Sequence, residues 1–302
     1  MFLYLLLSAM LFRFVFVRKE THDLNDMSAP ENEYLKAYHP IILDGLAFME
    51  QHAPQFCTTR SFDGLTLAAE YFDRGSDCTV LLFHGYRSAS RRDFSCAVRA
   101  YYEMGLNVLL VQQRSHGKSE GKLITFGVKE RRDVATWIDY ILQRGGREQR
   151  LLLGGMSMGA STVLMAAGLA LPEQVKGVIA DCGYTSPVAI LNAVAHKAFH
   201  FSALPFIPAM ELYCRLFGGF GICGVSAVKA LQKTKLPVLL IHGTADGFVP
   251  YRMSEENYAA IAGEKQLVSV EGADHGLSYL VDTNAVEGAI QAFVTRTVSP
   301  HS

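Results

Sequence analysis

LLLGGMSMGASTVL, residues 151–164, decides the fold of this 302-residue chain. An apolar run enters a G-x-S-x-G pentapeptide centred on Ser157 and leaves it with helical spacing. This order predicts a strand, a sharp turn and a helix, an arrangement that raises a serine hydroxyl clear of a sheet. Gly155 and Gly159 lack side chains, so strand and helix can pass close together. The alternative is a glycine-rich loop that happens to contain a serine, and the rest of the chain decides between them.

Length and composition fit one large α/β domain that carries an insertion. Half of the residues are hydrophobic, 19% are charged, and the formal net charge is -1. Such a chain can bury a large core, and nothing in its charge favours a nucleic-acid partner. The six cysteines form no C-x-x-C pair, so we expect free thiols rather than a disulfide or zinc framework. No metal and no cofactor are expected.

Residues 1–19 form a hydrophobic segment in which Met1–Val17 is interrupted only by Ser8 and Arg13. We expect an uncleaved membrane anchor, with a cleaved signal peptide or a helix packed on the domain as alternatives. Arg18 and Lys19 then place the catalytic domain in the cytoplasm by the positive-inside rule. Residues 20–55 are expected to form a polar linker and a leading helix. On this interpretation the segment adds nothing to the site, and a chain that begins near Asn25 keeps its activity.

Residues 56–298 alternate short apolar runs with helical patterns. An antiparallel hairpin around Asp63-Gly64 comes first, and further strands are expected near residues 79–83, 107–112, 150–153, 175–180, 237–241 and 266–270. The alternation predicts a mostly parallel central sheet flanked by helices. An aromatic and proline-rich stretch at about 184–235 interrupts it and predicts a small helical lid over Ser157, with Phe206 and Met210 in an apolar acyl pocket. The alternative is that this insertion only packs on the domain.

Two further predicted strands are followed by side chains that could activate a serine: an acid and a histidine. The strand near 238–241 is followed by His242-Gly243-Thr244-Ala245-Asp246, and the strand near 267–270 by a loop that contains His275. Ligands bind outside the carboxyl ends of parallel strands, so these side chains are expected to meet Ser157 there. His275 can take the serine proton while Asp246 orients its ring. Asp181, which ends another strand, is the second choice for the acid.

An oxyanion hole needs two backbone N–H donors beside the nucleophile. Met158 follows the serine directly and is expected to supply one. The strand near 80–83 ends in His84-Gly85-Tyr86, and the missing side chain of Gly85 lets the Tyr86 amide approach a substrate carbonyl. Tyr86 is therefore the expected second donor.

These pieces together resemble the α/β-hydrolase superfamily, in particular its serine aminopeptidase or Bem46-like serine hydrolases. The resemblance rests on His84-Gly85-Tyr86, Gly155-Met156-Ser157-Met158-Gly159, the Asp246 and His275 loops, and residues 113–119, which are similar to the family's D-x-R-G-H-G-x-S loop. In that loop Gln112 and Ser115 stand where the family often has Asp and Gly. The resemblance implies the α/β-hydrolase fold for residues 56–293.

The expected function is a serine hydrolase that cleaves carboxylic esters through an acyl-enzyme. A thioesterase or a peptidase with the same residues is one alternative, and a non-catalytic binding protein on the same fold is another. The expected partners are a small ester or acyl substrate and, through Met1–Val17, a membrane. Residues 219–224 match G-x-G-x-x-G but follow a helical pattern, so they are not read as a nucleotide site.

Overall fold

A single twisted sheet organises the computed structural model, which describes residues 2–19, 30–146 and 148–298. In the described part the sheet has eight strands in the order β1-β2-β4-β3-β5-β6-β7-β8. The strands are β1 (Gln55–Arg60), β2 (Thr66–Phe72), β3 (Cys78–Phe83), β4 (Asn107–Gln112), β5 (Arg150–Met156), β6 (Val175–Asp181), β7 (Val238–Gly243) and β8 (Lys265–Val270).

The sheet is antiparallel only at its first edge. β1 pairs with β2 and β2 with β4 in antiparallel fashion, whereas every pairing from β4 to β8 is parallel. The central strand β3 is buried along its whole length, as continuous apolar strands covered on both faces are. Parallel pairing brings the carboxyl ends of β3, β5, β6, β7 and β8 to one edge, where the loops of interest begin.

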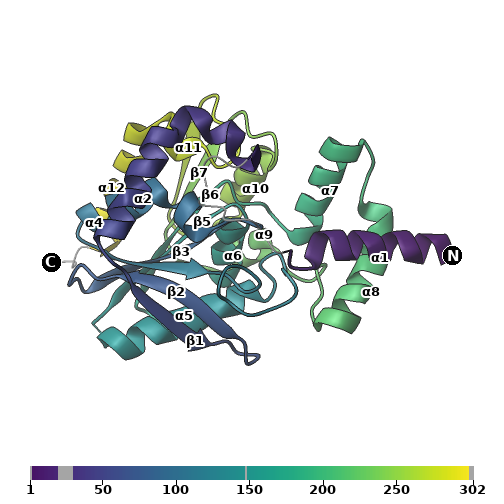
Figure 1. The fold of residues 1–302 in the computed structure, drawn as a ribbon, viewed down its shortest axis with the longest axis horizontal. Helices are drawn as coiled ribbons and strands as arrows, with labels where there is room; N and C mark the ends of the chain where they lie inside the picture. The colour runs from purple at the N-terminus through teal and green to yellow at the C-terminus, as the bar shows by residue number, and fades with distance from the viewer. Residues whose placement is uncertain (1, 20–29, 147, 299–302) are drawn as a thin grey trace.

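Helices cover both faces of the sheet (Figure 1). One face packs against α5 (Glu130–Gly145), α6 (Met158–Ala166), α9 (Ala227–Leu231) and α10 (Arg252–Ala260). The other packs against α4 (Ser95–Glu103) and α12 (Thr283–Val298), with α2 (His39–Gln51) lying on α4. Short helical segments complete the chain: η1 (Pro30–Tyr38), α3 (Ser90–Asp93) and α11 (Ser278–Val281).

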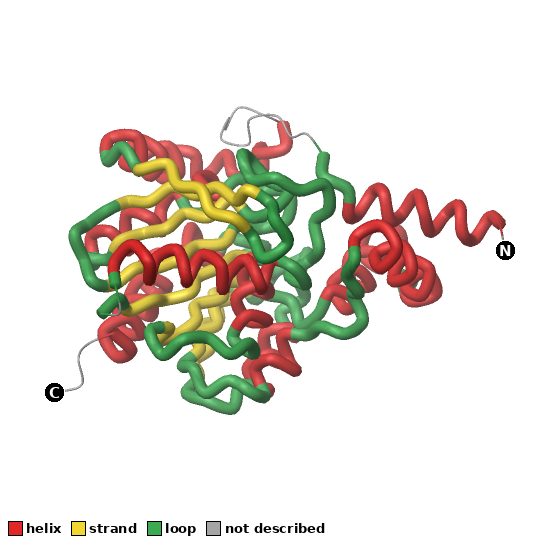
Figure 2. The backbone as a smooth tube through the Cα atoms, turned by 90° about the horizontal axis from the view of Figure 1, so that it is seen from below, coloured by secondary structure: helices red, strands yellow, loops and turns green. Residues whose placement is uncertain are grey.

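The insertion between β6 and β7 is helical. It comprises α7 (Pro187–Phe199), η2 (Leu204–Phe206), α8 (Ile207–Gly218) and α9. Ser186 caps the first turn of α7 by accepting a hydrogen bond from the Ala189 amide, and a proline at the next position suits a helix start. Figures 1 and 2 both place α7 and α8 beyond the end of the sheet, beside the N-terminal helix α1 (Phe2–Phe16).

The expected fold class is confirmed, and the strands lie within a few residues of the predicted ranges. One helix prediction needed change: the leading helix is divided into η1 and α2. The predicted linker at 20–29 lies outside the described residues.

The N-terminal segment is a helix packed on the protein, which is the alternative left open by its sequence. Phe16 is fully buried, and its ring meets those of Phe126 and Phe220 at centroid distances of 5.4 and 6.0 Å. Val17 forms a β-bridge with Leu123. Across the described residues, no helix has the length and apolar character needed to cross a bilayer.

Candidate active site

Ser157 sits on a strained turn between β5 and α6. Its backbone has φ 55° and ψ −113°, a conformation that few side chains adopt, and its amide donates to Asp181 O at 2.8 Å. A Cβ on Gly159 would overlap the carbonyl oxygen of Phe83, so only glycine fits there. The turn predicted from the pentapeptide is present, and it places the serine at the carboxyl edge of the sheet.

The loops after β7 and β8 bring two further side chains to this serine. His275 Nε2 lies 2.9 Å from Ser157 Oγ, and His275 Nδ1 lies 2.7 Å from Asp246 Oδ2. Asp246 can only accept at this oxygen when ionised, so Nδ1 carries the hydrogen and Nε2 is left to accept the serine proton. The arrangement can deprotonate a hydroxyl group that attacks a carbonyl carbon.

Asp246 is fully surrounded by donors. Its Oδ1 accepts from the amides of Phe248 and Val249 at 2.7 and 2.8 Å, and its Oδ2 also lies 3.0 Å from Nε2 of the buried His242. Burial acts to raise the pKa of this carboxyl, but the hydrogen bonds from His242 and His275 outweigh it and hold the pKa well below the usual range. The carboxylate is therefore ionised at neutral pH.

His242, a residue without a predicted role, supports Asp246. Its Nε2 faces two acceptors, Asp246 Oδ2 and, at 3.1 Å, Val249 O, so this nitrogen carries the hydrogen. Its Nδ1 lies 2.6 Å from Ser254 Oγ. A histidine four residues before the candidate acid is the only signal that the sequence offered for this contact.

Asp181, the second choice for the acid, occupies a different environment. It lies at the end of β6, where Ser278 Oγ donates to its Oδ1 at 3.0 Å. Burial raises its pKa to about 6, and no hydrogen bond joins it to His275 among the described residues. The structure thus brings Asp246, and not Asp181, to the histidine ring.

The loop after β3 holds Tyr86, one of the two expected amide donors, and the other, Met158, begins α6. The Gly85 amide donates to Asp93 Oδ2 at 2.8 Å, and the Arg87 amide donates to His116 Nε2 at 3.0 Å. The Tyr86 amide between them, like that of Met158, has no acceptor within the described part of the chain. Both amides are thus available to an oxygen of a bound molecule.

Residues 113–119, which resemble the family's D-x-R-G-H-G-x-S loop, support the loop after β3. His84 Nδ1 donates to Gly85 O at 2.8 Å, while its Nε2 accepts from the Gln113 amide at 3.1 Å. His116 accepts from Arg87, and its Nδ1 donates to Arg114 O at 2.9 Å. Burial lowers the pKa of both histidines, which favours the uncharged rings that these contacts need. The bracing by His116 was not foreseen from the sequence.

The N-terminal helix also reaches this loop, which corrects the expectation that it stands apart from the site. The Tyr86 hydroxyl donates to Val15 O at 2.7 Å, and the Arg87 guanidinium donates to Phe14 O and Val17 O at 2.5 and 3.1 Å. Phe14 and Val15 belong to the last turn of α1, whose carbonyls no helical amide satisfies, and Val17 follows the helix. The contact between Tyr86 and Val15 could not be predicted from the sequence, because about 70 residues separate the partners.

One group of side chains in the described part has metal-ligand spacing: Cys182, Asp246 and His275. A thiol binds metals as the thiolate, and burial raises the pKa of Cys182 well above its usual value. Asp246 and His275 are bonded to each other. The donor set thus fits the hydrogen-bonded arrangement better than a metal.

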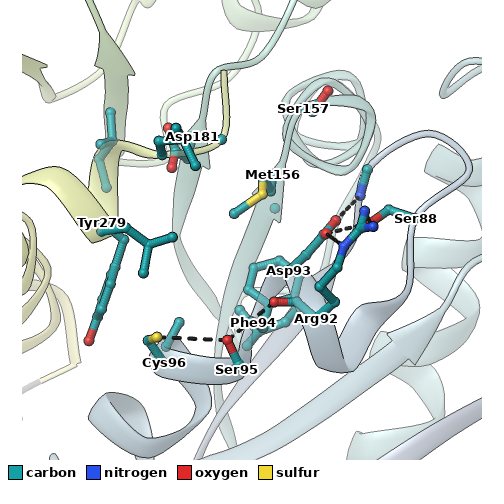
Figure 3. Close-up of a pocket in the computed structure, with 18 of the residues that line it drawn as sticks. Ser88, Arg92, Asp93, Phe94, Ser95, Cys96, Met156, Ser157, Asp181 and Tyr279 are labelled. Atoms are coloured by element: carbon teal, nitrogen blue, oxygen red, sulfur yellow. Dashed lines mark hydrogen bonds and ion pairs between the residues drawn. The ribbon is translucent and has the colours of Figure 1, made fainter. Parts of the chain in front are cut away.

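A cavity of about 250 Å³ adjoins Ser157 and runs between the sheet and the α2–α4 layer. Figure 3 shows Met156, Asp181 and Tyr279 around it together with Ser157. Its apolar lining comes from β strands, from α4 and α12, and from the segment before β1: Leu35, Ile42, Leu82, Phe94, Ile179 and Ile290. The expected pocket residues are elsewhere: Met210 is in the core, and Phe206 stacks on Tyr4 at 5.8 Å.

Two family models match consecutive parts of the chain. The model described as serine aminopeptidase, S33, matches residues 75–212, and the model described as TAP-like protein matches residues 224–302. The first covers the Tyr86 loop and the Ser157 turn, and the second covers Asp246 and His275.

Known proteins and structures agree with these matches. The uncharacterized protein YqkD of Bacillus subtilis is 26% identical over 216 residues, which cover 72% of this chain and 70% of YqkD. The esterase Pf2001 of Pyrococcus furiosus superposes with a TM-score of 0.66 at 23% identity, over 83% of this chain and 96% of the esterase. Est1E of Butyrivibrio proteoclasticus, solved with ferulic acid, superposes with a TM-score of 0.60 at 21% identity, over 78% of this chain and 97% of Est1E. Sheet order, strand-end loops and family models agree, and the chain belongs to the α/β-hydrolase superfamily.

Proposed function

We propose that this hydrolase cleaves carboxylic esters through an acyl-enzyme on Ser157. His275 acts as the general base and acid, Asp246 orients and stabilises its ring, and the amides of Tyr86 and Met158 bind the oxyanion. The observation that carries the proposal is the continuous chain of hydrogen bonds from Ser157 Oγ through His275 to Asp246, at 2.9 and 2.7 Å, on a strained turn.

The proposed reaction has two steps. Ser157 Oγ attacks the ester carbonyl while its proton passes to His275 Nε2, and that proton then goes to the departing alcohol. A water molecule, deprotonated by the same nitrogen, then attacks the acyl-serine; the proton passes from His275 to the departing Ser157 Oγ, and the acid is released. The negative charge of Asp246 stabilises the charged imidazole at both stages, and each oxyanion forms beside the Tyr86 and Met158 amides.

The cavity beside Ser157 supports a small apolar acyl group as the preferred one. Its volume of about 250 Å³ is below the range of pockets that hold drug-sized ligands. Its lining is largely aliphatic and aromatic, and Asp181, the carboxyl at its inner wall, has a pKa raised to about 6 by burial. A charged or bulky acyl chain would fit poorly there.

The nucleophile is tested by labelling with a fluorophosphonate, which reacts with activated serines. The native protein should be labelled at Ser157, and Ser157→Ala should abolish the label. Ser161→Ala, one turn further along the same helix, is the matched control and should still be labelled. A folded native protein that takes no label would favour the binding-protein alternative.

A panel of ester, thioester and aminoacyl substrates tests the leaving group. Esters should give the highest kcat/KM, in keeping with the esterases among the similar structures. The serine aminopeptidase model that matches residues 75–212 makes a peptidase the second candidate. Faster turnover of aminoacyl amides than of esters would replace the esterase proposal with that one.

The acyl pocket is tested by filling it. Ile42→Trp, in the cavity wall, should lower kcat/KM for butyrate esters relative to acetate esters. Phe206→Ala, in the insertion, is the control and should leave that ratio unchanged. The opposite pattern would return the acyl site to the insertion, as the sequence had predicted.

A further inference from the structure

One side of α1 is buried and the other is an exposed apolar stripe. Ser8, Phe12 and Phe16, spaced four residues apart, face the protein. Leu3, Leu7, Met10 and Phe14 follow the spacing of the opposite side of a helix and are 42–65% exposed. A surface helix normally presents polar residues to water, whereas this helix is apolar on its outer side as well.

The insertion continues this apolar surface. Tyr213 donates to Leu5 O at 2.9 Å, and Phe217 lies beside Phe12 with ring centroids 6.1 Å apart, so α1 and α8 are side by side, as Figure 1 shows. On α8, Leu216 and Phe217 are 66% and 70% exposed. We call the exposed stripe of α1 together with these two α8 residues the α1–α8 platform. An exposed apolar surface of this extent marks an interaction site.

The α1 part of the platform is positively charged. Residues 2–19 contain Arg13, Arg18 and Lys19 and no acidic residue. Lys19 Nζ lies 4.5 Å from the centre of the exposed Phe14 ring, so a cation stands directly beside the apolar stripe.

This combination selects an anionic lipid surface over the other apolar partners. A second copy of the chain would bring two clusters of like charge together, which disfavours self-association. Spanning is excluded for α1, because its 15 residues cover about 22 Å against a hydrocarbon core of about 30 Å and one side of it is occupied by protein. A helix with an apolar outer side flanked by Lys and Arg lies flat in the membrane interface.

We propose that the α1–α8 platform docks this hydrolase on the surface of an anionic membrane, with α1 parallel to the bilayer. The apolar stripe enters the boundary between headgroups and acyl chains, and Arg13 and Lys19 contact the anionic headgroups. The candidate site adjoins this face, because the Tyr86 hydroxyl donates to Val15 O and the Arg87 guanidinium donates to Phe14 O of α1.

Flotation of the full chain with vesicles tests the proposal. The native protein should float with phosphatidylcholine vesicles that contain phosphatidylglycerol, more weakly with pure phosphatidylcholine, and less as salt is raised. Leu216→Glu with Phe217→Glu should weaken binding to the anionic vesicles by at least about tenfold. Arg13→Glu with Lys19→Glu should weaken it by about tenfold or more, on anionic vesicles only.

The matched control is Leu43→Glu, which places the same charge on an exposed apolar position of α2, 52% exposed and on another helix. It should bind vesicles like the native protein, and thermal melts should show all variants folded. Equal binding of native and platform variants, or none by the native protein, would overturn the proposal. So would a native dimer in light scattering that Leu216→Glu with Phe217→Glu converts to monomer, since the platform would then be a subunit interface.

Discussion

The histidine half of the candidate site and its oxyanion half are held in place by different parts of the chain. Asp246 and His275 stand on loops that leave neighbouring parallel strands, and the contacts that fix Asp246 come from residues 242–249 and from His275. The Tyr86 loop is fixed by Asp93 and His116 and by the carbonyls of α1, far away in sequence. The first half is local to the sheet edge, and the second depends on a terminal helix.

The two halves of the candidate site should differ in how easily they lose their geometry. A carboxylate with four donors in a buried loop keeps its position as long as the sheet is folded. The oxyanion loop also depends on α1, and a terminal element can separate from a domain without global unfolding. Changes in the first half should therefore abolish the chemistry, whereas changes in the supports of the second should weaken it.

The largest expected effect is at the nucleophile. Ser157→Ala should lower kcat for a water-soluble ester by about 10⁴ to 10⁶, because the amide donors and substrate binding alone remain. Circular dichroism and a thermal melt would show whether the fold is kept. Residual activity within about tenfold of the native protein would remove Ser157 from the mechanism.

Next comes the acid, where two aspartates can be compared directly. Asp246→Asn should lower kcat by up to about 10⁴, since the amide no longer stabilises a charged imidazole and favours the wrong tautomer. Asp181→Asn removes a carboxyl of the same size that does not contact His275 and should have a much smaller effect. A more damaging Asp181→Asn would reverse the assignment.

A smaller loss is expected when the support of the oxyanion loop is removed. Tyr86→Phe deletes the hydrogen bond to Val15 O but keeps the backbone amide, so kcat should fall by about tenfold, less than the 10² to 10³ for a lost donor. KM for the same ester should change little. Native kcat in this variant would mean that α1 does not position the loop.

The buried and exposed sides of α1 offer a matched pair of substitutions whose effects on the free energy of unfolding can be compared. Phe16→Ala should lower the free energy of unfolding by about 3–5 kcal/mol, because the ring is fully buried between Phe126 and Phe220. Phe14→Ala, 55% exposed, should change it by less than about 0.5 kcal/mol. A chain that begins near Asn25 should then lose stability, contrary to the expectation from sequence. Urea unfolding measures all three.

A pH dependence of stability is expected at Asp181. Its pKa in the folded protein is about 6, above the ordinary value of 3.8, so the folded state holds a proton that the unfolded chain releases. The stabilisation from this group is complete below about pH 4 and is lost as pH rises through 6. Asp181→Asn should therefore gain stability relative to the native protein between pH 4 and 7, and parallel curves would argue against the raised pKa.

The sequence predicted what local pattern determines. Most strands were visible as apolar runs, and the first was placed by the hairpin turn at Asp63-Gly64. The order Ser157, Asp246, His275 at strand ends predicted that the three side chains lie at one edge. The supports were not visible, because the contacts of Tyr86 with Val15 and of Arg87 with His116 join segments with no common pattern. The acyl pocket was predicted in the wrong place for a related reason. Composition shows that the insertion is apolar, but only the packing of the folded chain determines where apolar side chains enclose a cavity.

The bonds between α1 and the insertion have a consequence for synthesis of the chain. Tyr4 donates to Pro205 O, a contact that spans 201 residues. At about 5–20 residues per second, the ribosome needs roughly 10–40 s to produce the partner after the helix has been made. Throughout that interval α1 lacks the insertion that covers one of its apolar sides, so nascent chains should need a chaperone or a lipid surface to shield this helix until α8 has been made.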